Sequence, residues 1–526
     1  MRTTAIIQHI KSSRLPGTLC ERSLPFAVIT LLTACALAIH GYHPYAEDGG
    51  LYATGIKFLL NPALYPHSLP FVEAHLRFSL FAPAVAATVR FTHLSLATVL
   101  FAIYLISIWT TLYGIWLLSE RCYSSRVAHA GAVLLVAAWL TVPIAGTSLM
   151  LMDPYVTARS VSLPCTLFAL AATLDLRIPG RCVRSLILCA IMLLVAAAAH
   201  PLMAAYGLGN VLLLLTILSP SPSVRRWGIV GLCTSAFAVA ALVQATAPPD
   251  SAGYVRIAIT RYYWFLSQWQ WYELIGIIAP LLILIIATLV VSRRRDLNSP
   301  VHQSRQALTA MAVVTGTTAV LIALAFAHES YASHLVARLQ PLRSFQTIYL
   351  LMILVLGAAL GEHLLRRKPW RWIAALIFFG SIFFLVQQST YPSSAHIEWP
   401  DVNPQNRWEK AFLWISRNTP VDALFALDPH YISLPGEDAQ NFRALAERSA
   451  LADYSKDGGE ASITPALTYA WAEGQRLQNR LSLESDTERL KALKPAGVDW
   501  IILQLQAQTT FDCPYRNDLV KVCRLP

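Results

Sequence analysis

The chain has 526 residues, of which 55% are hydrophobic and only 13% charged, and its mean hydropathy is +0.49. A soluble domain usually carries about 25% charged residues, so these values argue against a purely soluble protein and favour a polytopic helical membrane protein. The net charge of +11 does not indicate nucleic-acid binding, because most Lys and Arg residues form short clusters between apolar runs, which is a topology signal.

Apolar runs of membrane-spanning length recur through the first three quarters of the chain. The first is not followed by a small-residue cleavage site, so we expect it to remain as a span. The run at 186–199 ends at His200-Pro201, which predicts a tight turn between two spans, although a single kinked helix also fits. In total we predict eleven spans, at about residues 24–40, 95–118, 127–145, 160–175, 186–199, 202–219, 227–245, 272–291, 307–327, 344–361 and 370–388.

The apolar stretch 76–92 decides the predicted topology. If it lies in the membrane interface rather than spanning, the basic clusters all fall on one side, which the positive-inside rule assigns to the cytoplasm. The N-terminus is then cytoplasmic, and a long first loop (41–94) and the C-terminal region lie outside. These clusters are Arg2, Lys11, Arg14 and Arg22; Arg121 and Arg126; Arg177, Arg181 and Arg184; Arg225 and Arg226; Arg293, Arg294, Arg295 and Arg305; and Arg366, Arg367, Lys368 and Arg371.

The first outer loop carries the adjacent carboxylates Glu47 and Asp48, directly before a diglycine at 49–50. A carboxylate just outside a span can serve as a general base toward an acceptor hydroxyl. Its neighbour can raise the pKa of that base, orient the acceptor or bind a divalent cation. The alternative is a pair of loop carboxylates that cap a helix starting near Leu51.

Arginines in the outer loops form the second group of candidates, because positive-inside statistics keep such loops poor in arginine. A guanidinium matches phosphate oxygens in a bidentate geometry. The alternative for each is snorkelling toward lipid headgroups or pairing with a nearby acid. We predict donor-phosphate binding by Arg343 and Arg338 above all, and by Arg256, Arg261 and Arg159.

Other polar residues of the outer face are candidate accessory residues. Asp153 is either a second acid of the site or a cap before Pro154. His200 precedes Pro201 at a membrane turn and is either an accessory residue of the site or a structural histidine. His43 and His75 lie in the same loop as the acidic pair.

Residues 389–526 are charged, contain no further span and predict a small outer α/β domain. Cys513 and Cys523 lie ten residues apart and form either a disulfide in an oxidising compartment or two buried thiols. CxxC and zinc-finger spacings are absent, so a structural metal site is not expected. The predicted helices lie near 404–418, 439–448, 465–480 and 485–494, and the predicted strands at 423–428, 498–504 and 519–525.

The layout resembles the GT-C superfamily of membrane glycosyltransferases, in the bacterial branch of protein mannosyltransferases and aminoarabinose transferases. The motif AEDGG at 46–50 resembles the acidic motif of their first outer loop. The stretch 62–91 resembles the interfacial helices that follow it, and TARSVSLP at 157–164 and AAAHPLMA at 197–204 resemble recurrent features. No motif of the WWD type is found, so asparagine-linked transfer is not supported.

The resemblance implies a glycosyltransferase that takes a sugar from a polyprenyl-phosphate-linked donor at the outer face of a bacterial-type inner membrane. It implies Asp48 as the catalytic base or acceptor-orienting acid, with Glu47 beside it, and the arginines as ligands of the donor phosphate. The sugar, the acceptor, metal dependence, oligomeric state and the choice between inverting and retaining transfer stay open. A lipid-linked glycan flippase or transporter and a non-catalytic glycan-assembly protein are the alternatives.

Overall fold

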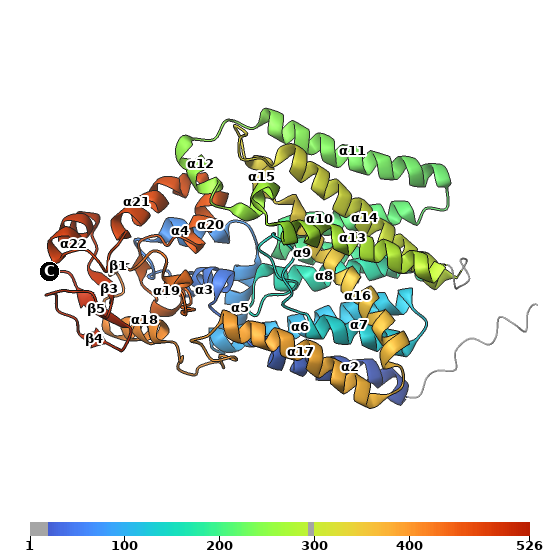
Figure 1. Cartoon of the computed structure of the whole chain (residues 1–526), viewed down its shortest axis with the longest axis horizontal. Helices are drawn as coiled ribbons and strands as arrows, with labels where there is room; N and C mark the ends of the chain where they lie inside the picture. The colour runs from blue at the N-terminus through green and yellow to red at the C-terminus, as the bar shows by residue number, and fades with distance from the viewer. Residues whose placement is uncertain (1–18, 293–298) are drawn as a thin grey trace, which may run out of the picture.

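The computed structural model describes residues 19–292 and 299–526. A bundle of long helices forms one end of the molecule, and a smaller mixed domain forms the other end, where the C-terminus lies (Figure 1). Part of the topology prediction rests on residues outside the described ones, namely Arg2, Lys11, Arg14, Arg293, Arg294 and Arg295.

Each of the eleven predicted spans corresponds to a helix. Within the described residues, seven helical stretches are long and apolar enough to cross a membrane, while α2, α7 and α10 contribute shorter apolar helices. The number of spans and their orientation therefore stay predictions. The helices are α2 (Leu19–His40), α6 (Leu96–Cys122), α7 (Arg126–Ala138), α8 (Ala158–Asp175), α9 (Cys182–Ala199), α10 (Pro201–Ile217), α11 (Pro222–Thr246), α13 (Trp271–Ser292), α14 (Pro300–Phe326), α16 (Phe345–Ala359) and α17 (Pro369–Thr390).

The helix α7 ends at Ala138, seven residues before the predicted end of its span. The chain then folds back on itself in an irregular segment, 139–157, in which the backbone N–H of Leu151 donates to the carbonyl of Val142 at 3.0 Å. Pro143 has no N–H to continue a helix. Gly146 packs against the Trp269 ring so closely that a Cβ would lie 2.6 Å from it.

The first outer loop forms three helices, α3 (Glu47–Leu60), α4 (Leu69–Leu76) and α5 (Phe81–Thr92). The stretch 76–92 is thus mostly α5, a helix of 12 residues. Exposed apolar side chains at Phe78, Leu80 and Phe91 are consistent with a position in the membrane interface, which remains a prediction.

The C-terminal domain contains a five-stranded sheet in the order β2-β1-β3-β5-β4, in which β1 is parallel to β2 and β3, and β5 is antiparallel to β3 and β4. Three strands lie where the sequence predicts them; β2 and β4, of two residues each, are too short to produce an alternating pattern. The strands are β1 (Leu424–Ala426), β2 (Ser449–Ala450), β3 (Trp500–Gln504), β4 (Tyr515–Arg516) and β5 (Val520–Arg524), and the α-helices are α18 (Arg407–Asn418), α19 (Phe442–Ala446), α20 (Lys456–Ile463), α21 (Thr468–Gln478) and α22 (Asp486–Leu493).

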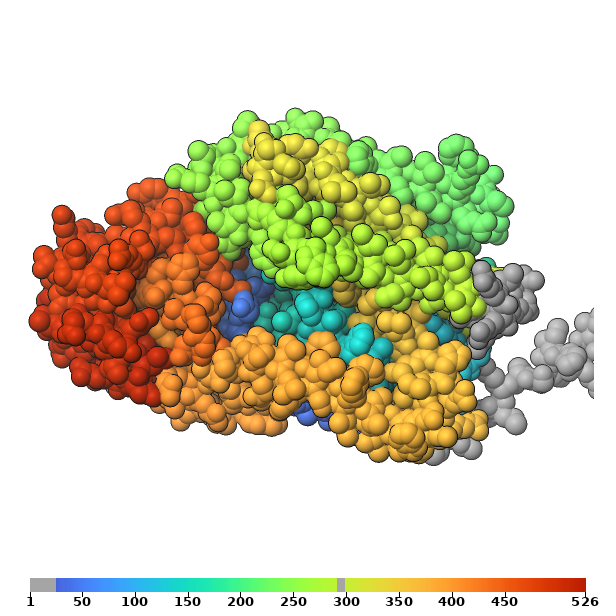
Figure 2. Space-filling view, in the orientation of Figure 1, coloured from blue at the N-terminus to red at the C-terminus, as the bar shows by residue number. Residues whose placement is uncertain are grey.

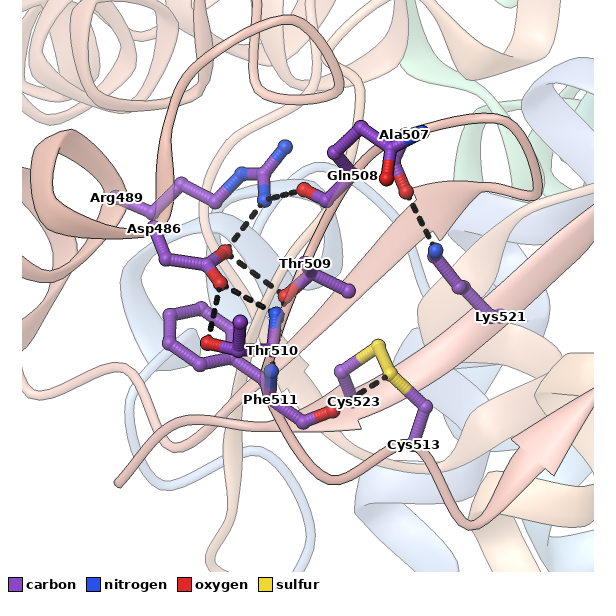
Figure 3. The surroundings of a disulfide bond; sticks show 10 residues. All are labelled: Asp486, Arg489, Ala507, Gln508, Thr509, Thr510, Phe511, Cys513, Lys521 and Cys523. Carbon is purple, nitrogen blue, oxygen red and sulfur yellow. Dashed lines mark hydrogen bonds and ion pairs between the residues drawn. A yellow bond between two sulfur atoms is a disulfide. The ribbon is translucent and has the colours of Figure 1, made fainter.

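A disulfide joins Cys513 to Cys523 (Figure 3). Cys523 belongs to β5, and Cys513 follows the loop that leads out of β3. The same loop is tied to the start of α22, because Asp486 accepts a hydrogen bond from the backbone N–H of Thr510 at 2.6 Å. The disulfide therefore fixes a loop at the end of the sheet far from the helix bundle (Figure 1).

The C-terminal domain packs directly on the first outer loop. At the start of α3, the backbone N–H of Tyr45 donates to the Gln440 side chain at 2.9 Å. Toward the other end of α3, Lys57 forms an ion pair with Glu447 at 2.6 Å. These contacts hold α3 in place between the bundle and the domain, where Figure 1 shows it.

Candidate active site

A cavity of about 1290 Å³ lies where the helix bundle, the first outer loop and the C-terminal domain meet. Figure 2 shows a recess in the same region between α13 and α17, with parts of the N-terminal third of the chain at its floor. The cavity is lined by the start of α3, by His75 on α4, by residues of the 143–159 segment, by the His200 turn, by residues 260–276 and 338–349, by the end of α17 and by residues 454–463 of the C-terminal domain.

Arg159 brings two of the predicted acids together. Its guanidinium donates to Oδ2 of Asp48, with both terminal nitrogens at 3.2 Å, and to Oδ2 of Asp153 at 2.9 Å. Arg159 and Asp153 are buried. Arg159 is therefore already bonded to two carboxylates, which argues against its predicted role as a free phosphate ligand.

The two carboxylates that share Arg159 have pKa values shifted in opposite directions. Burial by itself raises the pKa of Asp48, but the cations Lys456, Arg159 and Arg343 outweigh it and hold that pKa well below its usual range. Burial dominates at Asp153 and raises its pKa despite Arg159. Asp48 is thus firmly ionised, whereas Asp153 holds a proton more readily.

The diglycine after the acidic pair allows close packing on both sides of α3. A Cβ on Gly49 would lie 2.7 Å from the carbonyl of Pro44, and a Cβ on Gly50 would lie 2.2 Å from Cβ of Asn441 in the C-terminal domain. A larger residue at position 49 or 50 would therefore prevent α3, which begins with the acidic pair, from packing this closely against its neighbours.

Lys456, at the start of α20, reaches the acidic pair from the C-terminal domain. Its ammonium contacts Oε2 of Glu47 and lies 3.7 Å from Oδ1 of Asp48. Asp48 therefore lies between two cations, with Arg159 at one carboxylate oxygen and Lys456 near the other.

Arg343 is the predicted phosphate ligand whose charge remains available. It lines the cavity, and its buried Nε has no hydrogen-bond partner in the described part of the chain. Leaving a buried cationic donor without a partner is unfavourable. An anionic ligand in the cavity would supply the missing acceptor.

Two further arginines also line the cavity but bind the C-terminal domain. Arg261 donates to the carbonyl of Ser455, and Arg338 donates to the carbonyl of Ile463, each at 3.2 Å. These carbonyls flank the two ends of α20, so both arginines hold this helix against the bundle. Arg256 is exposed on α12 (Ala252–Ala258) and does not line the cavity, so its contact with a donor phosphate stays a prediction without support from this cavity.

The candidate histidines separate into two groups. His75 lines the cavity and forms an ion pair with Glu460 of α20 at 2.8 Å, and its ring meets that of Tyr52 edge-on. His200 also lines the cavity, and its Nδ1 accepts a weak bond from the Met203 backbone N–H at 3.4 Å, as a cap of α10.

His43, predicted as a possible accessory residue, does not line the cavity itself. It is fully buried, its Nδ1 lies 2.8 Å from Oε1 of Glu398, and its ring stacks on Tyr391 at 3.7 Å between centroids. Tyr391 itself faces the cavity, so His43 supports the site from behind.

The lining is rich in tyrosine, a residue that combines an apolar face with a hydrogen-bonding hydroxyl. Such side chains suit a ligand that presents both C–H faces and hydroxyl groups. The tyrosines are Tyr52, Tyr155, Tyr262, Tyr263, Tyr272, Tyr349, Tyr391 and Tyr454.

No group of three or more His, Cys, Asp or Glu side chains within residues 19–292 and 299–526 is arranged to hold a metal ion. The divalent cation considered from the sequence stays a prediction, and Lys456 already contacts the acidic pair that would bind it.

Sequence reasoning missed Lys456 and Glu460. The only local signal is the diglycine between them, at 458–459. A Cβ on Gly458 would lie 2.9 Å from the Trp471 indole nitrogen and 3.0 Å from an Arg261 nitrogen. This glycine therefore marks a close approach of α20 to the bundle.

Comparisons with known proteins find distant structural similarity. No protein-family model matches the chain, and no curated protein matches it. Among solved structures, the chain is similar to an oligosaccharyltransferase from Archaeoglobus fulgidus in complex with Zn and sulfate, at 12% identity and a TM-score of 0.40, over 91% of this chain and 68% of that one. This similarity is too distant to support a function.

Proposed function

We propose that this protein is a membrane glycosyltransferase that moves a sugar from a polyprenyl-phosphate-linked donor to an acceptor hydroxyl in the cavity. The observation that carries the proposal is that one cavity is lined both by an ionised carboxylate, Asp48, and by a guanidinium, Arg343, whose Nε has no hydrogen-bond partner among the described residues. Glycosyl transfer from a phosphate donor needs both an acceptor-orienting base and charge stabilisation at the leaving phosphate.

Arg343 is the best candidate for the donor phosphate. Its Nε has no hydrogen-bond partner in residues 19–292 and 299–526, whereas Arg159, Arg261 and Arg338 already have bonding partners. A guanidinium can donate two parallel hydrogen bonds to phosphate oxygens. Arg343 would therefore bind the phosphate in the ground state and stabilise its charge as the bond to the sugar breaks.

The surroundings of the cavity suit a donor with a lipid chain. Residues of α13 and of the end of α17 line it, among them Gly276 and Thr390. Both helices expose large apolar side chains along their length, such as Ile278 and Ile377. The recess between α13 and α17 (Figure 2) would let an isoprenoid chain stay in contact with lipid while the phosphate reaches Arg343.

Asp48 is the candidate acceptor-orienting base. In the proposed step, the acceptor hydroxyl oxygen bonds to C1 of the sugar, the C1–O bond to phosphate breaks, and polyprenyl phosphate leaves with the electron pair. The low pKa keeps Asp48 ionised, so it can accept a hydrogen bond from the acceptor throughout. It takes the hydroxyl proton only late, when bond formation has made that hydroxyl strongly acidic.

The test is a transfer assay on the purified protein in lipid nanodiscs. Polyprenyl phosphates carrying radiolabelled hexoses or pentoses are supplied with an envelope extract as the acceptor source, and release of free polyprenyl phosphate is measured. Asp48→Asn is expected to abolish release while expression and melting temperature stay near wild type. The matched control is Asp401→Asn, because Asp401 is an exposed carboxylate bonded to Ser95 outside the cavity.

Full activity of Asp48→Asn would refute the assignment. Absence of release from every donor in the wild-type protein, together with movement of the intact lipid-linked sugar across sealed vesicles, would instead identify a flippase.

A further inference from the structure

The contact between Lys456 and the acidic pair joins two distant parts of the chain in the lining of the cavity. We propose that Lys456 is the counter-ion that makes the acidic pair compatible with an anionic donor, so that the C-terminal domain completes the active site. This inference rests on the proposed function, because it concerns the charge that the donor phosphate meets.

The position of Lys456 is specific. Its ammonium contacts Glu47 and lies 3.7 Å from Oδ1 of Asp48, while Arg159 bonds Oδ2 of the same carboxylate. The Lys456 side chain is only 14% exposed. Lys456 is thus largely enclosed and lies near the Asp48 oxygen that Arg159 does not bond.

The backbone that carries Lys456 is fixed within the C-terminal domain. The Lys456 N–H donates to Oδ1 of Asp453 at 2.6 Å. The next residue, Asp457, forms a buried bidentate pair with Arg443, at 2.6 and 2.9 Å. This network leaves the lysine little freedom to point elsewhere.

The rest of α20 is bonded to segments of the membrane part. Glu460 pairs with His75 of α4, and the carbonyl of Ser462 accepts a hydrogen bond from the Tyr254 hydroxyl at 2.6 Å. Arg261 and Arg338 bind the carbonyls that flank the helix. Lys456 is therefore held at the acidic pair by both domains.

The charges around the acidic pair show why this cation matters. Within the described residues, the carboxylates of Glu47, Asp48 and Asp153 form ion pairs with two cations, Arg159 and Lys456, and Arg343 acts on Asp48 as a third cation. Loss of Lys456 would increase the negative charge around the acidic pair, which opposes entry of a phosphate. The charged and titratable groups that face the acidic pair and Lys456 are Arg159, Arg343, His75, Asp153, Tyr52, Tyr155, Tyr263 and Tyr391.

Kinetics of three variants test the role. Lys456→Met is expected to raise the KM for the donor by roughly tenfold and to move the acidic limb of the pH–rate profile toward neutral pH, because Asp48 loses a cation that lowers its pKa. Lys456→Arg keeps the positive charge and is expected to have a donor KM and an acidic limb close to those of the wild-type protein. The control is Lys57→Met, which removes the ion pair between Lys57 of α3 and Glu447 of the C-terminal domain. This variant should change neither the donor KM nor the acidic limb.

Amine labelling tests the contact without any transfer assay. With acetic anhydride at alkaline pH, Lys456 of the wild-type protein is expected to react far more slowly than the exposed Lys410, because two carboxylates keep its ammonium protonated. In Glu47→Gln/Asp48→Asn the rate at Lys456 should rise toward that of Lys410. The labelling therefore reports on the ion pair even if the proposed glycosyl transfer fails.

Two results would overturn the inference. One is equal labelling of Lys456 and Lys410 in the wild-type protein, which would mean that the ion pair does not form. The other is an unchanged donor KM and an unchanged acidic limb in Lys456→Met, while Asp48→Asn is inactive. Failure of transfer in the wild-type protein with protected Lys456 would instead refute the proposed function and the donor-binding role built on it.

Discussion

The Arg159 guanidinium lies 3.2 Å from Oδ2 of Asp48, although 111 positions separate the two residues in the chain. The bond joins the first turn of α3 to the first turn of α8. Asp153 shares the same guanidinium, so the acidic pair of the first outer loop belongs to a larger charged cluster.

Arg159→Met is expected to destabilise the protein by about 3–5 kcal/mol, because it leaves Asp153 and Asp48 as uncompensated carboxylates in a largely buried site. Asp153→Asn should destabilise the protein much less, since it removes one of the negative charges while Arg159 still bonds Asp48. Thermal unfolding in detergent measures both. Equal melting temperatures for the two variants would contradict the shared-arginine arrangement.

Arg343→Gln is expected to weaken binding of farnesyl phosphate by roughly tenfold to a hundredfold, because it removes charge-assisted hydrogen bonds to the phosphate. Isothermal titration in nanodiscs measures this affinity. Arg256→Gln is the control, since Arg256 is exposed outside the cavity and its loss should leave binding unchanged. If both variants bind as tightly as the wild-type protein, Arg343 is not the phosphate ligand.

The His75–Glu460 pair predicts a pH dependence in the docking of α20. Burial lowers the pKa of His75, but Glu460 and Asp48 more than offset this and raise it above its usual value, which is about 6.5. The docked state thus binds the His75 proton more tightly than the undocked state. The stability contributed by the pair is complete below about pH 6.5 and is lost as the pH rises through the raised pKa of His75 in the docked state.

Hydrogen exchange of the peptide covering α20, corrected for intrinsic rates, checks this. Protection should fall on going from pH 6 to pH 9 in the wild-type protein and stay nearly constant in His75→Gln. Protection that increases with pH in the wild-type protein would contradict the predicted loss of α20 docking at high pH.

Gly50→Ala is expected to separate α3 from the C-terminal domain, because the new Cβ would lie 2.2 Å from Cβ of Asn441 and 2.6 Å from the carbonyl of Tyr45. Overpacking of this kind costs about 1–3 kcal/mol, which the melting temperature should report. Gly209→Ala, on α10, meets nothing within 4 Å and should melt at or above the wild-type temperature. Wild-type stability of Gly50→Ala would mean that the two elements are not closely packed.

Much of the helical architecture could be predicted from the sequence, because apolar runs of membrane length are strong signals. The errors have physical reasons. The helix α7 ends early because the backbone turns back before Pro143, and β2 and β4 are too short to show a pattern. The π-helical turn η4 (Leu360–Leu365) at the end of α16 likewise leaves no mark in hydrophobic periodicity.

The site was only partly predictable. The acidic pair stands out because carboxylates beside a span are rare, and arginines in outer loops stand out for a similar reason. Sequence alone could not distinguish Arg343 from Arg261 and Arg338. The latter two donate to carbonyls at the ends of α20, which come near them only in the folded protein. Lys456 was missed because a lysine in a charged domain carries no signal of its own.

Photo-crosslinking with a lipid-linked sugar tests the central claim most directly. A polyprenyl-phosphate sugar with a photoreactive group near the phosphate is expected to label peptides from 143–155, 260–276 or 338–349. Labelling should be competed by unlabelled polyprenyl phosphate and reduced in Arg343→Gln. Label confined to lipid-exposed helices such as α11, without competition and unaffected by Arg343→Gln, would contradict the assignment of this cavity as the donor site.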